Sequence, residues 1–252
     1  MSETDLIPLL AVDKLSVAFG RTVAVEEVSL TLHKGEAVAL AGSNGMGKST
    51  TLLAIAGGLP LDSRTGGNIL YRGAPLKKGR PEISMVPESD KVFMTMSVED
   101  NLRCINDLQG KGDVGRDDVL GWFPRLAERR KTLAGNLSGG EQQMLAMGMA
   151  LVGSPRLLLL DEPTLGLAVP VIRQLCETLR QIRQDLSLSI LVAEADSQWL
   201  SSFAESAFVI QRGCTIAHLE GGLEAHADRI NNMLLGGEDT PEAWTPKRAN
   251  TV

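Results

Sequence analysis

The 252-residue sequence predicts an α/β fold, and three observations support this prediction. Continuous apolar runs at 37–41, 157–160 and 190–192 are typical of buried parallel strands. Segments with helical patterning separate these runs, and such alternation is the pattern of α/β folds. A glycine-rich loop directly follows the first run and leads into a helix. The length accommodates one large α/β domain with an inserted subdomain.

The amino-terminal third of the chain predicts an antiparallel β layer. Residues 12–19 and 23–32 carry β-branched side chains in rough alternation, which favours strands of an edge sheet. Residues 49–56 favour a helix that Gly57 and Gly58 close as a C-cap pair. Two further strands are expected at 68–72 and 83–86.

The middle of the chain predicts helices. Ser97 followed by Glu99 and Asp100 is typical of a helix start, because the serine caps the amino end and the acids complement its dipole. Helical signals continue from there to about residue 151. The carboxy-terminal part then alternates, with helices at 170–183 and 197–205 and strands at 190–192 and 207–210.

The composition disfavours several classes of protein. The formal net charge is −6 and no basic stripe is present, so we expect no nucleic-acid partner. The cysteines Cys104, Cys176 and Cys214 fall in no metal or disulfide pattern and favour free thiols. Residues 1–5 show no secretory signal, and no apolar run approaches the roughly 20 residues that span a bilayer. We therefore expect a cytoplasmic protein that reaches a membrane only through partners.

The loop Gly42–Ser49 matches the pattern G-x-x-x-x-G-K-[ST] completely. Glycines let backbone N–H groups turn toward phosphate oxygens, and Lys48 adds a positive charge to the same oxygens. The Ser49 hydroxyl can bind Mg²⁺, while the helix that follows directs its positive end at the phosphates. The expected ATP contacts are Gly42, Ser43, Asn44, Gly45, Met46, Gly47, Lys48, Ser49 and Thr50. A glycine-rich structural turn is the alternative, but the loop also stands between an apolar strand and a helix, which is the context that phosphate binding requires.

The apolar run 157–160 ends in Asp161 and Glu162. An acid at the end of such a strand can hold Mg²⁺ or its water, which is the role expected for Asp161. Glu162 can polarise the attacking water as a general base. Alone this pattern more often belongs to a plain buried strand, but together with the phosphate loop it indicates ATP hydrolysis with ATP and Mg²⁺ as cofactors.

Residues 137–143 read LSGGEQQ, in which Ser138, Gly139 and Gly140 offer a hydroxyl and N–H groups at a helix start. This heptad and the phosphate loop resemble the ATPases of ATP-binding cassette (ABC) transporters over about residues 10–235. The resemblance implies a RecA-like P-loop NTPase core with an antiparallel β layer and an inserted helical subdomain. It implies a single ABC ATPase domain at 1–236, with core segments at about 10–88 and 154–236, a helical signature subdomain at about 89–153 and a loose tail at 237–252.

Further site residues are implied by this resemblance. In ABC proteins the signature closes on ATP held by the opposite subunit, which assigns that contact to Ser138, Gly139, Gly140 and Glu141. Phe19 stands where an aromatic stacks on adenine, although an edge-strand core residue is the alternative reading. Glu88 stands at the lid position that touches Mg²⁺, with Ser49 and Asp161 as the other magnesium ligands.

Two features depart from the resembled pattern. Glu194 stands where the family has a histidine, or in one branch a glutamine, that reaches the γ-phosphate. We count it with Glu162 as catalytic, and its charge predicts slower hydrolysis. In the alternative reading Glu194 points into solvent and the alignment of this segment with the family is shifted by one residue. The segment between Tyr71 and Ile83 is several residues shorter than in the branch of the family that has the glutamine, which could alter docking to a membrane partner.

Four phrases resemble the ATPases of branched-chain amino acid uptake systems, at 86–88, 122–126, 140–146 and 162–168. We expect the ATP-binding and hydrolysing motor of such an importer, peripheral on the inner face of the membrane. A urea or amide importer and a hydrolysis-impaired nucleotide-dependent subunit are alternatives. Expected partners are transmembrane permease subunits, a second ABC ATPase subunit and, indirectly, an extracytoplasmic solute-binding protein. A soluble ABC protein of DNA repair or translation is disfavoured, because the chain shows one cassette and no coiled-coil insertion.

Overall fold

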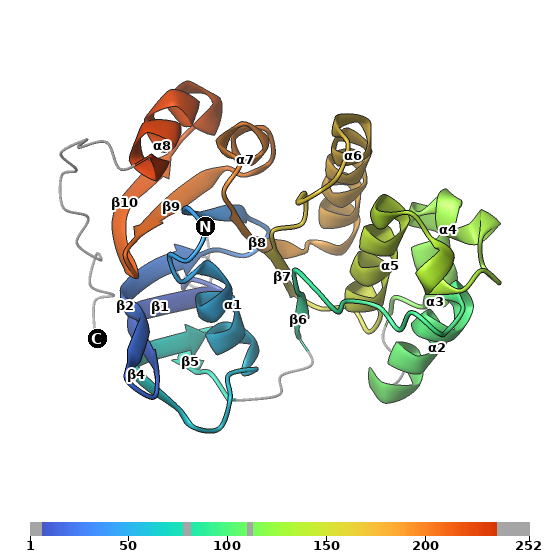
Figure 1. Cartoon of the computed structure of the whole chain (residues 1–252), viewed down its shortest axis with the longest axis horizontal. Helices are drawn as coiled ribbons and strands as arrows, with labels where there is room; N and C mark the ends of the chain where they lie inside the picture. The colour runs from blue at the N-terminus through green and yellow to red at the C-terminus, as the bar shows by residue number, and fades with distance from the viewer. Residues whose placement is uncertain (1–6, 78–81, 110–112, 236–252) are drawn as a thin grey trace. The chain divides into compact units, whose positions relative to one another are not determined.

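The computed structural model describes residues 7–77, 82–109 and 113–235 (Figure 1). The chain divides into two compact units, of which the first combines residues 1–79 and 191–252 and the second comprises residues 80–190. The predictions for the amino terminus at 1–5 and for the tail at 237–252 lie outside the described residues.

An antiparallel β layer forms the amino-terminal part of the first unit, as predicted. Strand β1 (Leu10–Phe19) pairs antiparallel with β2 (Thr22–Leu32) on one side and with β4 (Ser63–Tyr71) on the other. A short strand, β5 (Ala74–Pro75), pairs with β4. Strand β4 begins five residues before the predicted start at residue 68, because pairing with β1 overrides the low strand propensity of its glycines.

The remaining strands of the first unit include the predicted buried strand β3 (Ala37–Ala41), all of whose residues are buried. It pairs parallel with β9 (Ser206–Gln211), and β9 forms an antiparallel hairpin with β10 (Cys214–Glu220). With β8 (Ser189–Glu194), whose first two residues belong to the second unit, the strand order here is β5-β4-β1-β2-β10-β9-β3-β8.

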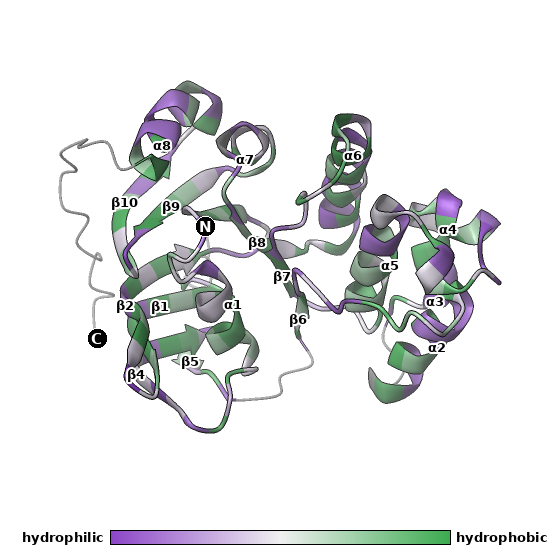
Figure 2. Cartoon of the chain, viewed as in Figure 1, coloured by the Kyte–Doolittle hydropathy of each residue, from purple (hydrophilic) through white to green (hydrophobic). Residues whose placement is uncertain are grey.

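The helices of the first unit are α1 (Lys48–Ala56), α7 (Ser197–Phe203) and α8 (Ala227–Leu234), and a 3-10 turn at Leu223–His226 precedes α8. Gly57 ends α1 in the left-handed conformation with φ 75°, which confirms the predicted C-cap. Helix α8 and strand β10 were not predicted. Figure 2 shows hydrophilic and hydrophobic residues on α8, whose buried residues are Ile230 and Met233.

The second unit contains two parallel strands, β6 (Ile83–Val86) and β7 (Leu157–Asp161), in which Ile83 lies opposite Leu157. Its helices are α2 (Val98–Gln109), α3 (Arg116–Trp122), α4 (Pro124–Glu128), α5 (Gly139–Leu151) and α6 (Val169–Leu186), with a 3-10 turn at Ala134–Asn136. The predicted start of α2 is confirmed, since the backbone N–H of Asp100 donates to Ser97 Oγ at 3.1 Å.

Buried polar contacts fix the loop before α2. Asn101 is fully buried, its Nδ2 donates to the carbonyls of Phe93 and Ser97 at 3.1 and 2.9 Å, and its Oδ1 accepts from the Phe93 N–H at 2.8 Å. The side chains of Phe93, Met94 and Met96 nevertheless stay exposed. Within the described ranges, no helix has the length and apolar content needed to cross a membrane.

Candidate nucleotide site

Two glycines of the phosphate loop lie where backbone from other strands leaves no room for a side chain. A Cβ added to Gly42 would come within 2.9 Å of the Ile210 carbonyl oxygen of β9. Gly47 has φ 95°, and a Cβ there would lie 2.6 Å from the Ala24 carbonyl oxygen of β2. Both positions therefore require glycine for the loop to close in this shape.

The loop leads into the amino end of α1. Gly47 is the N-cap in a left-handed conformation and supplies no side-chain acceptor to the first turn of the helix. The hydroxyl of Thr51 donates to the Gly47 carbonyl at 2.9 Å, and the backbone N–H of Thr51 donates to the same oxygen at 2.9 Å. A helix that starts in this way presents N–H groups and a positive dipole end, which together favour an anion.

Lys48 lies inside the curve of the loop. The residue is 3% exposed, and its Nζ donates to the carbonyl oxygens of Gly42 at 2.7 Å and Ser43 at 3.2 Å. A buried ammonium held by carbonyl oxygens carries its charge where phosphate oxygens could replace those acceptors. Ser49 and Thr50, on the first turn of α1, are partly exposed. Asn44 and Gly45 form the exposed tip of the loop.

Two contacts of the loop were missed by sequence reasoning. Ser43 Oγ donates to the carbonyl oxygen of Leu234, at the end of α8, at 2.6 Å. The backbone N–H of Arg212 donates to the Met46 sulfur at 3.1 Å. These partners are 191 and 166 residues away in the chain and contribute backbone groups, so no sequence pattern could have pointed to them.

Phe19 and Glu194 belong to the same unit as the loop. Phe19 ends β1 and is partly exposed, opposite Thr22 of β2. Glu194 ends β8 and is only 4% exposed, so the reading in which it points into solvent is wrong. Its Oε1 accepts from the N–H groups of Ala195 at 2.9 Å and Asp196 at 3.4 Å, while its carbonyl accepts from the Gly42 N–H at 3.3 Å. The backbone of Glu194 thus contacts the phosphate loop directly.

The second unit carries the acidic pair after β7. Asp161 is the last residue of the strand and is 4% exposed. Glu162 follows with φ 44°, a left-handed conformation that is unusual for a residue with a side chain, and it is 9% exposed. Such backbone strain concentrates at functional sites, which supports a chemical role for Glu162. Glu88, two residues after the end of β6, is exposed.

The signature residues form the start of α5. Ser138 is the N-cap and makes a capping box with Glu141: the Glu141 N–H donates to Ser138 Oγ at 3.3 Å, and Glu141 Oε2 accepts from the Ser138 N–H at 2.8 Å. The Ser138 hydroxyl donates to the same carboxylate oxygen at 2.9 Å. Arg129 Nε lies 2.9 Å from Glu141 Oε1. Partial burial acts to raise the pKa of Glu141, but the Ser138 contacts and the guanidinium groups of Arg129 and Arg125 outweigh it and lower the pKa.

The two signature glycines differ in their surroundings. A Cβ on Gly140 would lie 2.7 Å from Cγ1 of Val171 on α6, so packing within this chain requires glycine there. A Cβ on Gly139 would meet no heavy atom of the described chain within 4 Å, apart from its chain neighbours and the backbone of its own helix. Packing explains Gly140, whereas nothing around Gly139 in the described chain explains its lack of a side chain.

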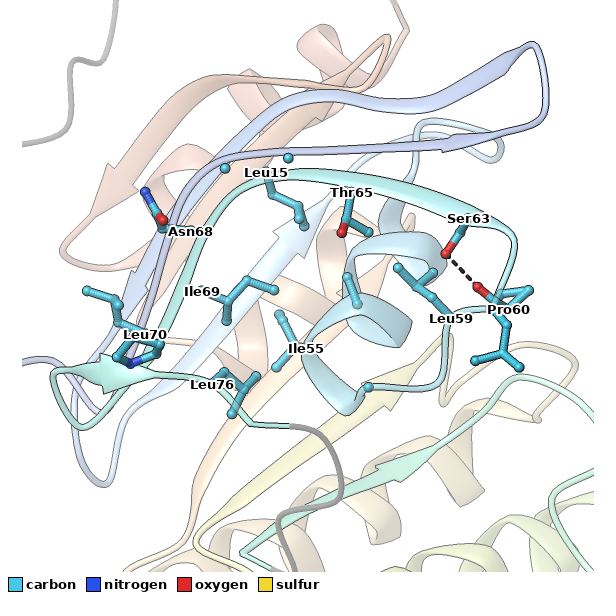
Figure 3. A pocket seen from close by; sticks show the side chains of 16 residues that line it. Leu15, Ile55, Leu59, Pro60, Ser63, Thr65, Asn68, Ile69, Leu70 and Leu76 are labelled. Carbon is cyan, nitrogen blue, oxygen red and sulfur yellow. Dashed lines mark hydrogen bonds between the residues drawn. The ribbon is translucent and has the colours of Figure 1, made fainter.

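A cavity of about 350 Å³ lies in the first unit between α1 and β4 (Figure 3). Leu15, Ile55, Leu59, Ile69 and Leu76 are among its lining residues. It borders the carboxy-terminal turn of α1, whereas the phosphate loop joins the opposite end of that helix. The cavity shares no residue with the phosphate loop.

A glycine loop closed over a buried lysine at the start of a helix defines a phosphate-loop nucleotide-binding protein. Residues 25–165 match the ABC transporter family. The chain is 39% identical over 237 residues to a high-affinity branched-chain amino acid transport ATP-binding protein, BraG, of Pseudomonas aeruginosa, covering 91% of this chain and 100% of that protein. It is 31% identical to the lipopolysaccharide export system ATP-binding protein LptB of Escherichia coli, covering 90% of this chain and 97% of that one.

Solved structures agree with this result. The fold is similar to an ATP-binding subunit of an ABC transporter with a TM-score of 0.73 and 27% identity, covering 91% of this chain and 95% of that one. A nucleotide-free ATP-binding cassette from an ABC transporter gives a TM-score of 0.75 at 20% identity, covering 92% and 96% of the two chains. The chain therefore belongs to the ABC transporter family, as an ATP-binding subunit of the kind that hydrolyses ATP. The predicted family and fold class are confirmed.

Proposed function

We propose that the chain is the ATPase motor of an ABC importer for branched-chain amino acids. The single observation that supports this most is the phosphate loop: Gly42 and Gly47 close it over the 3%-exposed Lys48 at the amino end of α1. The cargo follows from the similarity to the branched-chain amino acid transport protein of Pseudomonas aeruginosa. Under this proposal the ATP contacts are the loop residues 42–50, with Phe19 stacked on adenine.

Magnesium fits the oxygen donors that the proposal assigns to it. Ser49 offers a hydroxyl on the first turn of α1, and Asp161 offers a buried carboxylate at the end of β7. Mg²⁺ prefers such hard oxygen ligands and usually takes only one or two carboxylates from the protein, with phosphates and water completing its shell. Glu88 would join from the lid position. The ion would neutralise phosphate charge during hydrolysis.

In this proposal the catalytic groups for hydrolysis are carboxylates of this chain. Glu162, held by its strained backbone after β7, takes a proton from the attacking water as general base. Lys48 keeps its charge on the phosphate oxygens throughout. Glu194 is the second catalytic residue of the proposal, and its backbone carbonyl accepts from the Gly42 N–H at 3.3 Å.

The signature acts on ATP held by a second ATPase subunit in this proposal. Ser138, Gly139, Gly140 and Glu141 start α5, within a helical signature subdomain that we place at about 89–153. ATP then joins two subunits and hydrolysis releases them. The membrane partners are transmembrane permease subunits, which hold the chain at the inner face of the membrane, and an extracytoplasmic binding protein delivers the amino acid.

A second candidate function is a slow, nucleotide-dependent partner subunit. Glu194 favours it, because a buried carboxylate that binds the N–H groups of Ala195 and Asp196 stands where the family has a histidine. Such a subunit would bind ATP and complete its partner's site while contributing little hydrolysis.

The test begins with Lys48→Ala, which should abolish tight Mg-ATP binding and leave the fold intact, as circular dichroism would show. Unchanged ATP affinity would mean that the loop is only structural. The cargo is tested in proteoliposomes that hold the chain, its permease subunits and the binding protein. Leucine should stimulate ATP hydrolysis and accumulate, whereas urea should do neither; stimulation by urea alone would reassign the importer.

A further inference from the structure

Glu141 is shared between two groups at the start of α5. One carboxylate oxygen, Oε2, accepts from the Ser138 N–H and hydroxyl at 2.8 and 2.9 Å, and the other, Oε1, lies 2.9 Å from Arg129 Nε. The Glu141 side chain is 12% exposed, while that of Arg129 is 48% exposed. The carboxylate is therefore largely withdrawn from water and paired with one guanidinium.

The negative charge of Glu141 opposes the binding of an ATP phosphate at Ser138. The Ser138 hydroxyl is the group that would donate to a phosphate of ATP on the opposite subunit, yet it lies 2.9 Å from a carboxylate oxygen. A polyanion that approaches Ser138 approaches Glu141 as well, and like charges at this range repel strongly when partly withdrawn from water. A glutamine would make the same capping box without the charge. The negative charge is thus a cost unless another residue offsets it.

We propose that Arg129 is a positioning residue that allows the signature to bind the ATP of the partner subunit. The guanidinium neutralises the charge of Glu141 and holds its carboxylate in place through the contact with Oε1. When Ser138 turns its hydroxyl to phosphate, Glu141 keeps its partner and its charge stays compensated. This inference rests on the proposed function, in which Ser138 contacts ATP across a dimer.

The backbone around Arg129 suits this role. Arg129 follows α4 directly, its N–H donates to the Leu126 carbonyl at 3.1 Å, and its own carbonyl accepts from the Thr132 N–H at 2.8 Å. Two hydrogen bonds therefore fix the backbone from which the guanidinium reaches α5. The neighbouring Arg130 is engaged elsewhere, with its Nη2 2.8 Å from Glu99 Oε1. Lys131 is exposed and provides a matched control for loss of one positive charge in the same segment.

The experiment measures ATP-dependent association in the full chain. Glu162→Gln is the common background, since it removes the general base and preserves bound ATP. Sedimentation velocity gives the dissociation constant of the ATP-bound dimer, with the second ATPase subunit added where the pair is heteromeric. Isothermal titration gives the affinity of the monomer for ATP. The variants compared are Arg129→Ala, Arg129→Lys, Lys131→Ala, Glu141→Gln and the double variant Arg129→Ala with Glu141→Gln.

Arg129→Ala should weaken the ATP-bound dimer about tenfold while leaving the affinity of the monomer for ATP unchanged. Arg129→Lys should recover most of the loss, and Lys131→Ala should change little. The decisive variant is the double one: without the charge on Glu141 the arginine is not needed, so the dimer should return to within about twofold of Glu141→Gln alone.

Other results would overturn the inference. A double variant as weak as Arg129→Ala would show that Arg129 supports the fold or touches the partner by itself. A dimer unaffected by Arg129→Ala would show that Glu141 needs no compensation. If the Glu162→Gln background binds ATP but never associates, the proposed dimer fails and the role of Arg129 fails with it; if it does not bind ATP at all, the proposed nucleotide site itself fails.

Discussion

The two signature glycines invite a matched pair of substitutions, Gly139→Ala and Gly140→Ala. Each adds one methyl group at the start of α5, on adjacent residues of one helix. The surroundings differ: beyond its own helix and chain neighbours, a Cβ at 139 meets nothing within 4 Å in the described ranges, whereas a Cβ at 140 would lie 2.7 Å from Val171 Cγ1 and 3.6 Å from Val171 Cγ2. The pair therefore separates packing inside this chain from access by another molecule.

The expected effects on stability have opposite signs. Gly139→Ala should stabilise the protein by up to about 1 kcal/mol, because alanine loses less backbone entropy than glycine in a helix. Gly140→Ala should destabilise it by roughly 1–3 kcal/mol, since the β-branched Val171 has little freedom to move aside. Each kcal/mol corresponds to about 2–4 °C in Tm for a domain of this size. Val171→Ala should recover most of the loss caused by Gly140→Ala.

The expected effects on function have the same sign. Gly139→Ala puts a methyl group into open space where phosphate oxygens would approach the N–H groups of α5, and Gly140→Ala displaces the start of α5 against Val171. Both should therefore prevent ATP-dependent dimerisation. Scanning calorimetry measures the stability, and size-exclusion chromatography with excess ATP in the Glu162→Gln background measures the dimer. A Gly139→Ala variant that is stable and still dimerises like its parent would refute the reasoning, because the open space at 139 would then have no ligand. Loss of stability in that variant would contradict the open surroundings of Gly139.

Three further predictions concern hydrolysis and pH. Glu162→Gln should bind ATP and accumulate as a dimer while its hydrolysis falls at least tenfold; phosphate release equal to that of wild type would remove the residue from catalysis. Wild-type protein should hydrolyse ATP slowly and Glu194→His should raise the rate, with each tenfold gain equal to about 1.4 kcal/mol of barrier; equal turnover by wild type, Glu194→His and Glu194→Ala at saturating Mg-ATP would show that Glu194 does not limit hydrolysis. His218 stacks on Phe208 with ring centroids 3.9 Å apart, and burial lowers its pKa against the opposing effect of Glu220 and Glu36. Since the unfolded chain takes up this proton more readily, the stability that neutral His218 contributes is present above about pH 6.5 and is lost as the pH falls through the lower folded pKa. His218→Gln should therefore flatten the decline of Tm between about pH 7 and 5, and an unchanged slope would contradict this assignment.

Local signals in the chain were enough to predict several parts of the fold. The buried strands β3 and β7, the phosphate loop and the caps at Gly57 and Ser97 each depend on residues a few positions apart. A continuous apolar run indicates a buried strand without knowledge of the rest of the fold. A glycine at the end of a helix indicates a left-handed backbone conformation, and a serine at its start indicates a capping hydrogen bond. For that reason the fold class and the family could be predicted from the chain, and the same local signals carry the prediction of the candidate site residues.

Strand β10 and helix α8 escaped prediction, because β10 is recognisable mainly through its pairing with β9 and α8 is a short helix with a strong polar side. Both elements include or adjoin residues that contact the phosphate loop from distant segments of the chain. The carbonyls of Ile210 and Leu234 shape the phosphate loop through backbone atoms, which every residue type carries alike.

Side-chain surroundings were likewise beyond the sequence. Three such features are the pairing of Arg129 with Glu141, the contact distance between Val171 and Gly140, and the burial of Glu194. Each depends on residues whose spacing in the chain follows no helix or strand period. Motifs and hydrophobic periodicity involve residues that are close together in the chain, so they predict which chemical groups each segment offers. Packing between distant segments fixed which of those groups are compensated, crowded or open, because burial and Coulomb interactions depend on distance in space and not along the chain.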